Sequence, residues 1–165
     1  MRILVSNDDG IDAPGLRALV KALRRHAEVI IVAPATEQSA VGHAITIHDP
    51  LKVSERYHRD DFDGYAVYGT PADCVKLALC SLLQEPPDVI VSGINQGANL
   101  GTDIIYSGTV SAATEGTLLG IPSLAVSINA FDRNAHFETA ATAVKIILRH
   151  LPSFDVPPGT LLNIN

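Results

Sequence analysis

The sequence predicts an α/β fold in which a mainly parallel sheet is covered by helices on both faces. Short apolar runs alternate with longer amphipathic segments along the whole chain, which is the pattern of repeated strand–helix–strand units. The apolar runs are uninterrupted, as expected for parallel strands that are buried on both faces. With 165 residues and 47% hydrophobic content, the chain is long enough to bury the core of one domain.

The N-terminal half is expected to run from strand to helix to strand and then into polar segments. The run RILVS (2–6) reads as a buried strand, and Pro14 opens a helix over 14–26 in which leucine and valine recur at helical spacing. The β-branched run EVIIVAP (28–34) predicts a second strand that its proline ends. The remaining expectations are a polar loop over 35–47, short strands at 44–47, 51–53 and 65–69, and a solvated excursion over 54–64.

The C-terminal half repeats the alternation. A helix is predicted over 70–83, because Thr70 suits the N-cap, Pro71 the first position and Asp73 the third. A glycine- and asparagine-rich loop (93–108) separates the next strand from a helix of small residues. The other elements expected here are strands within 86–93, 123–128 and 160–165, and helices over 109–120 and 136–151.

Charge and hydropathy exclude two classes of partner. The formal net charge is −6 and the basic residues are scattered, which gives no electrostatic footprint for duplex nucleic acid or an anionic membrane. The chain contains no apolar stretch long enough to span a bilayer. Because Met1 leads directly into the first strand, we expect no signal peptide and a cytoplasmic location.

Polar residues gather where the predicted strands end. Asp8 and Asp9 follow the first strand, Ser39 lies in the loop after the second, and Asn95 and Asn99 follow the strand within 86–93. In an open parallel sheet, ligands bind beyond the carboxyl ends of the strands. We therefore expect these distant segments to converge on one crevice.

The adjacent acids Asp8 and Asp9 predict a cation in that crevice. Two carboxylates about 5 Å apart repel each other by roughly 3 kcal/mol at an effective dielectric constant of about 20, and a divalent cation reverses that cost. Oxygen ligands suit Mg²⁺, Mn²⁺ or Ca²⁺. Both acids can reach one ion only if the chain has turned, which Gly10 favours. The alternative is that the two acids are solvated turn residues or a helix cap.

The stretch Ser107-Gly108-Thr109 predicts a neighbouring anion site. It precedes a helix of small residues, and free N–H groups at a helix N-terminus attract phosphate. The alternative is an ordinary Ser/Thr cap. A metal site beside a phosphate site indicates phosphoryl chemistry, with either water or an aspartate as the nucleophile. Two other functions stay open: a phosphorylation-dependent receiver module, and a non-catalytic nucleotide-binding protein.

Several motifs resemble those of the survival protein SurE family of metal-dependent nucleotidases. They occur in the family's order over nearly the whole chain: SNDDG, the loop around Ser39, GTPADCV, SGINQGANLG, YSGTVSAATEG and GIPSLAVS. The resemblance implies a Rossmann-like three-layer α/β/α fold and hydrolysis of nucleoside 5′- and 3′-monophosphates. It also implies a homodimer or homotetramer, and a single domain over 1–165 that lacks the family's C-terminal segment.

The same resemblance assigns residues to roles. It implies one divalent cation per subunit, held by the carboxylates of Asp8 and Asp9, the hydroxyl of Ser39 and the amide of Asn95. Asp8, Asp9 and Asn95 would also be the catalytic residues. The phosphate-contacting residues that it implies are Asn99, Ser107, Gly108 and Thr109.

Overall fold

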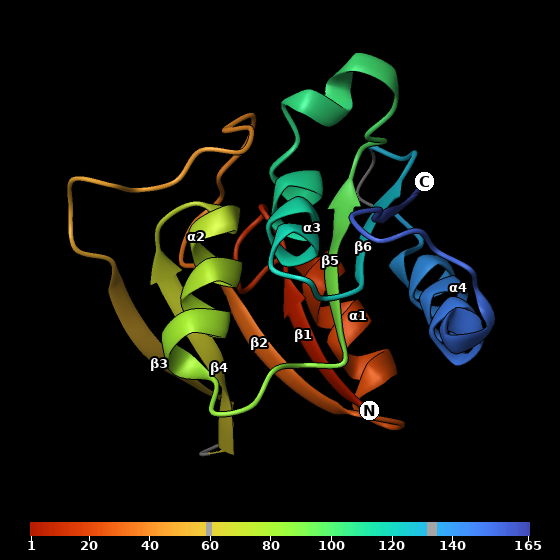
Figure 1. The fold of residues 1–165 in the computed structure, drawn as a ribbon, viewed down its shortest axis with the longest axis horizontal. Helices are drawn as coiled ribbons and strands as arrows, with labels where there is room; N and C mark the ends of the chain where they lie inside the picture. The colour runs from red at the N-terminus through yellow and green to blue at the C-terminus, as the bar shows by residue number, and fades with distance from the viewer. Residues whose placement is uncertain (59–60, 132–134) are drawn as a thin grey trace.

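The computed structural model describes residues 1–58, 61–131 and 135–165 and contains a seven-stranded sheet (Figure 1). The strands are β1 (Arg2–Ser6), β2 (Glu28–Pro34), β3 (Lys52–His58), β4 (Asp61–Tyr68), β5 (Val89–Gln96), β6 (Ser123–Ile128) and β7 (Leu162–Ile164). Their order across the sheet is β3-β4-β2-β1-β5-β6-β7. Among these strands the neighbours pair in parallel, except for the antiparallel β3 and β4.

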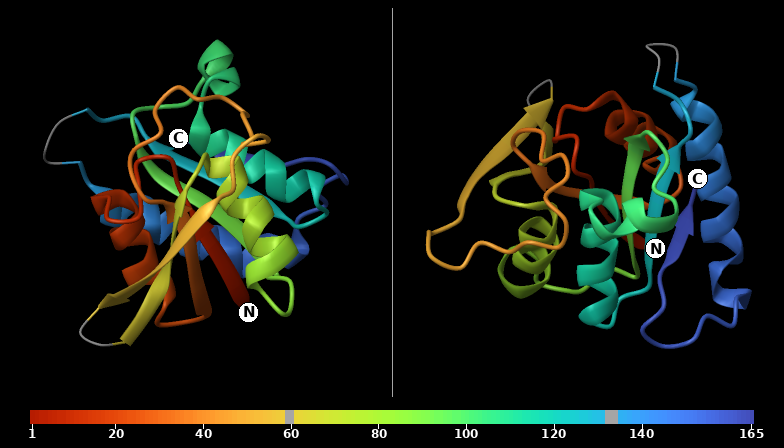
Figure 2. Two further views of the ribbon diagram at one scale, coloured as in Figure 1. Left: turned by 90° about the vertical axis from the view of Figure 1, so that its left-hand side faces the viewer. Right: turned by 90° about the horizontal axis from the view of Figure 1, so that it is seen from above.

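Helices cover both faces of the sheet, as the turned views in Figure 2 show. The helical segments are α1 (Pro14–Leu23), α2 (Pro71–Leu77), η1 (Ala78–Leu82), η2 (Gly101–Ile105), α3 (Gly108–Leu118), α4 (Phe137–His150) and η3 (Leu151–Ser153). Helices α1 and α4 share one apolar cluster with β1, while α2 and α3 contribute to a second cluster on the other face. The predicted three-layer α/β/α fold with a mainly parallel sheet is therefore confirmed. No described helix combines the length and apolar character needed to cross a membrane.

The central pair β1–β5 fixes the place where a ligand can bind. The pair is aligned from Ile3 opposite Val89 to Ser6 opposite Ser92, and the side chains of both strands are almost fully buried there. The helix that follows β1 lies on one face and the helix that precedes β5 lies on the other. This change of face opens a crevice beyond the carboxyl ends of the two strands.

The predicted solvated excursion over 54–64 is wrong, because β3 and β4 form a hairpin there, with residues 59–60 outside the described part. Most of β3 is exposed because it is an edge strand, so charged side chains on it replace the alternating pattern expected of a strand. An edge-to-face contact between Tyr57 of β3 and Phe62 of β4 joins the two strands, and Phe62 makes a second such contact with Tyr65 within β4. Residues 44–47, predicted as a short strand, form no regular element.

The buried position Leu148 tests how α4 packs against the sheet. Leu148 is 4% exposed against the sheet, whereas Ile146 on the same helix is 54% exposed. We expect Leu148→Ala to lower the free energy of unfolding by about 2–5 kcal/mol, because it leaves a cavity. The matched Ile146→Ala should change it by less than about 0.5 kcal/mol. Urea denaturation measures both, and equal losses would contradict this packing.

Candidate functional site

The candidate site is a cavity of about 740 Å³ at the carboxyl ends of β1 and β5. Its polar residues come from the loops after β1 and β2 and from the end of β5 with the connection to α3, which includes η2. Its polar lining consists of Asp8, Asp9, Glu37, Ser39, Asn95, Gln96, Asn99, Asp103 and Ser107. The structure therefore brings together six of the eight predicted site residues, and it places the other two, Gly108 and Thr109, directly behind Asp8.

Asp8 is held by the start of α3. Its side chain is 7% exposed, and its Oδ1 accepts a hydrogen bond from the hydroxyl of Thr109. Burial raises the pKa of the Asp8 carboxyl, while hydrogen bonds from the Thr109 hydroxyl and from the backbone N–H groups of Thr109 and Gly108 act to lower it. The negatively charged group that the N-terminus of α3 binds is thus the side chain of Asp8.

Gly108 permits this close approach. A Cβ at position 108 would lie 2.6 Å from Cβ of Asp8 and 3.0 Å from Cγ of Pro71. Thr109 is fully buried, and its hydroxyl is directed at Asp8. Ser107 caps α3 by accepting a hydrogen bond from the N–H of Val110 at 3.1 Å, as the ordinary-cap interpretation expects. It also lines the cavity, so phosphate contact by this segment stays a prediction.

Asp9 lies near two other carboxylates, those of Asp8 and Glu37. Burial raises its pKa to about 6, and the negative charges of Asp8 and Glu37 add to that effect. The turn that brings both acids to one side contains Gly10 at φ +100°, and the side-chain amide of Asn7 donates to the Gly10 carbonyl at 2.9 Å. The predicted turn at Gly10 is therefore present.

Ser39 and Asn95 supply neutral oxygen atoms to the same cavity. Ser39 Oγ donates to Oε1 of Glu37 at 2.5 Å. Asn95, near the end of β5, uses its amide Nδ2 to donate to the carbonyl of Gly97 at 2.8 Å. That bond engages the nitrogen, so Oδ1 is the Asn95 atom that can serve as a ligand.

Asn99 lies at the rim of the cavity and is held by neighbouring strands. Its Nδ2 donates to Ser127 Oγ at 2.8 Å, and its backbone N–H donates to Oδ1 of Asn165 at 2.7 Å. Asn163 Nδ2 in turn donates to the Asn99 carbonyl at 2.9 Å. These bonds fix the glycine-rich loop after β5 against β6 and β7.

The donor set fits a hard divalent cation. Within the described residues, no three His, Cys, Asp or Glu side chains are grouped so as to hold a metal ion. A cation here would therefore need hydroxyl and amide oxygens besides the two aspartates, and Ser39 and Asn95 provide them. The raised pKa of Asp9 is a second sign of fit. Burial is its largest cause, but the negative charges of Asp8 and Glu37 contribute to it, and a cation would neutralise those charges.

Two acids and two aromatic residues outside the predicted set also line the cavity. Glu37 adds a third carboxylate beside Asp9, and its only signal in the sequence is its position two residues before Ser39. Asp103 adds another acid from η2. Two aromatic rings at the rim are strongly exposed, Tyr106 by 61% and Phe131 by 80%. Exposed rings at a polar cavity provide flat apolar surface that an aromatic ligand could contact.

Comparison with known proteins identifies the family. The family model described as "Survival protein SurE" matches residues 3–165. Proteins called 5′-nucleotidase SurE are 56% identical over 169 residues in Desulforudis audaxviator and 54% identical over 165 residues in Pelobacter propionicus. Each alignment covers this whole chain and 65% of the relative.

A solved structure gives the same result. The crystal structure of the SurE protein from Aquifex aeolicus matches with a TM-score of 0.88 and 44% sequence identity, covering 99% of this chain and 64% of that one. The chain thus spans less than two thirds of the length of the relatives that it matches. A match of the family model to nearly every residue shows that the chain belongs to the SurE family.

Proposed function

We propose that the protein is a divalent-metal-dependent phosphomonoesterase that hydrolyses nucleoside 5′- and 3′-monophosphates to nucleoside and phosphate. The observation that carries the proposal is the convergence of Asp8, Asp9, Ser39 and Asn95 on one cavity that Ser107 also lines. Relatives at 50–56% identity that are called 5′-nucleotidase SurE support the substrate class. A cytoplasmic location, which is an expectation from the sequence, and an assembly of two or four copies, which the family resemblance implies, belong to the same proposal.

The residues of the chain divide the task. Asp8, Asp9, Ser39 and Asn95 would hold Mg²⁺, Mn²⁺ or Ca²⁺, which supplies positive charge against the phosphoryl oxygens and acts as a Lewis acid. Hydrogen bonds from Thr109 and the start of α3 orient the Asp8 carboxylate and favour its ionised form, against the effect of burial. The segment that contains Ser107 would contact the phosphate group of the substrate. Without a cation, the carboxylates of the cavity would repel a phosphate ester.

The receiver-module alternative lacks its central residue. Such a module needs an acceptor aspartate at the carboxyl end of a strand beside β1, and β5 ends in Asn95 and Gln96. Asp88 precedes β5 at the opposite end of the sheet, where its Oδ2 accepts from the backbone N–H of Arg2 at 2.7 Å. The geometry therefore favours hydrolysis over phosphoryl storage.

Asp8→Asn tests the proposed function directly. We expect wild-type protein to release phosphate from 5′-AMP and 3′-AMP with Mn²⁺ and to stop when a chelator is added. Asp8→Asn should lower kcat/KM by more than about 100-fold, because changes behind a metal ligand already cost about 10- to 100-fold. Asp155→Asn, at an exposed carboxylate, serves as the control. Nucleotide binding without phosphate release would instead identify a non-catalytic binding protein.

The raised pKa of Asp9 predicts a pH dependence of the metal-free protein. Between its ordinary value of 3.8 and about 6, the folded state keeps a proton on Asp9 that the unfolded state has lost. The Asp9 contribution to stability therefore falls as the pH rises through this window. The free energy of unfolding of wild type minus that of Asp9→Asn should decrease from pH 4 to pH 6 in urea titrations with chelator. A difference that stays constant would contradict the raised pKa.

Gly108→Ala tests the contact behind Asp8. The added methyl group would clash with Cβ of Asp8. That atom is attached directly to the backbone and is buried, so it cannot move aside without shifting the main chain of the site. We expect kcat to fall by about 10-fold or more, since small displacements of site residues are costly. Gly120→Ala, just beyond the other end of α3, meets no described atom within 4 Å. Its φ of +84° strains any added side chain and should lower stability, but the change lies away from the cavity and should leave the kcat of the folded protein unchanged. Equal kcat values for the two variants would show that Asp8 tolerates displacement.

A further inference from the structure

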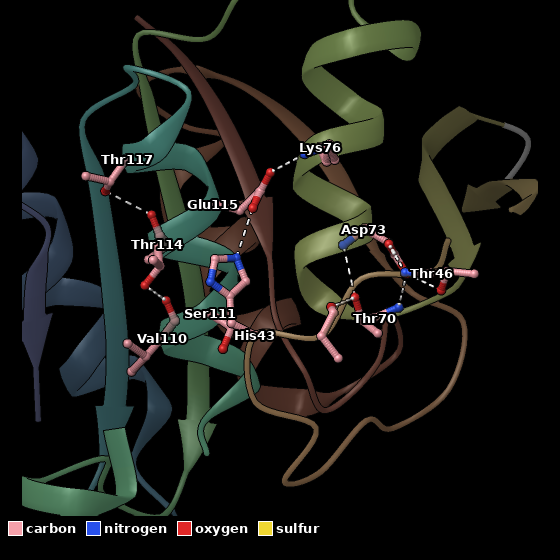
Figure 3. Close-up of polar contacts among 12 residues, drawn as sticks. His43, Thr46, Thr70, Asp73, Lys76, Val110, Ser111, Thr114, Glu115 and Thr117 are labelled. Carbon is pink, nitrogen blue, oxygen red and sulfur yellow. Dashed lines mark hydrogen bonds and ion pairs between the residues drawn. The ribbon is translucent and has the colours of Figure 1, made fainter. Parts of the chain in front are cut away.

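We propose that Asp73 on α2 and Glu115 on α3 are positioning residues that hold Ser39 at the candidate metal site. They act on the segment 35–51, which connects β2 to β3 and carries Ser39. We call the hydrogen bonds between this segment and the carboxylates of Asp73 and Glu115 the loop clamp; Figure 3 shows those made by Thr46 and His43. The inference rests on the proposed function only in treating Ser39 as a metal ligand.

The segment 35–51 needs polar contacts to keep its shape. It contains no helix or strand, and all of its residues are exposed or only partly buried. A long connection of this kind has little apolar burial to order it. Ala40, next to Ser39, nevertheless has the left-handed backbone φ of +55°. A non-glycine residue keeps that conformation only where the surrounding structure holds it.

The Asp73 carboxylate accepts hydrogen bonds from this segment in addition to the bond that caps its own helix. It is 2% exposed and forms a capping box with Thr70, which already satisfies the start of α2. The same carboxylate also accepts from the Thr46 N–H at 2.9 Å and from the Thr46 hydroxyl at 2.6 Å. The Thr70 hydroxyl adds a bond to the carbonyl of Ala44 at 2.7 Å. Burial acts to raise the pKa of Asp73, but these hydrogen bonds outweigh it and leave the pKa lowered.

Glu115 provides the second point of attachment. It is 5% exposed on α3, and its Oε2 lies 2.9 Å from Nε2 of His43 in the segment. Its Oε1 accepts from Lys76 of α2 at 3.1 Å. One carboxylate therefore joins the segment to both helices, and a buried carboxylate with two such partners has a defined position.

The loop clamp begins directly after the part of the segment that reaches the cavity. Main-chain bonds flank Ser39: the N–H of Gln38 donates to the Asp8 carbonyl at 2.7 Å, and the N–H of Gly42 donates to the Tyr106 carbonyl at 3.0 Å. The side-chain bonds then start at His43 and end at Thr46. Releasing them would free one side of the turn that presents Ser39.

Thr46→Val tests the loop clamp from the side of the segment. It removes the hydroxyl donor and leaves the Thr70–Asp73 capping box intact, so α2 should stay folded. Losing one net hydrogen bond corresponds to a change of about two- to tenfold in an equilibrium constant. We therefore expect Mn²⁺ affinity, measured by electron paramagnetic resonance of free Mn²⁺, to fall by about that factor.

Three variants separate positioning from general stability. Thr46→Ser keeps the hydroxyl and should retain wild-type Mn²⁺ affinity. Thr117→Val removes a similar hydroxyl bond, to the Ala113 carbonyl within α3, and should leave Mn²⁺ affinity unchanged. In a Ser39→Ala background, Thr46→Val should cause no further loss, because the two changes act through one ligand. Equal losses in both backgrounds would overturn the inference.

A measurement without metal keeps the inference independent of the proposed function. The amide hydrogens of Gln38 and Gly42 should exchange several-fold faster in Thr46→Val than in wild type or Thr117→Val, because both amides lie in bonds that the loop clamp supports. Unchanged exchange would overturn the loop clamp. Wild-type protein that binds no Mn²⁺ would overturn the proposed function, and the exchange rates would still decide whether the segment is held.

Discussion

Electrostatic repulsion among the carboxylates of Asp8, Asp9 and Glu37 is the constraint on which the rest of the site depends. Burial strengthens the repulsion because less water screens the charges. Burial, together with the charges of Asp8 and Glu37, raises the pKa of Asp9. The protein offsets part of the cost at Asp8 with the hydroxyl of Thr109 and the first amides of α3. The packed strands β1 and β5 help to offset the rest of the cost, since most of their side chains are buried.

The sequence allowed most of the fold to be predicted because its local signals agree with one another. The apolar strands, the capping box of Thr70 and Asp73 and the turn at Gly10 all appear as expected. The hairpin of β3 and β4 was missed because an edge strand exposes charged side chains, which conceal the alternation of a strand. The alternation of apolar and polar side chains identifies a strand only where one face of that strand is buried.

The candidate site was predictable to a smaller extent. The loops that carry Asp8, Asp9, Ser39 and Asn95 could be chosen because strand ends in a parallel sheet converge on one edge, and the family resemblance singled out Ser39 and Asn95 within them. Glu37 lies in the same loop as Ser39 and shares its place after β2, but nothing in the sequence distinguishes it from the other polar residues of that loop. The bond between Thr109 and Asp8 joins residues 101 positions apart, so only the three-dimensional placement of the start of α3 beside the loop after β1 reveals it. The same holds for Glu115, which meets His43 across 72 positions.

The distribution of the cavity residues over separate loops has a consequence for any attempt to transplant the site. An EF-hand carries its ligands within twelve consecutive residues and keeps its character when moved into another scaffold. Here the acids follow β1, the hydroxyl follows β2 and the amide ends β5, so no contiguous peptide contains the set. A host would have to reproduce the spacing and twist of the central strands, and a synthetic fragment of any one loop should have no affinity for the ion.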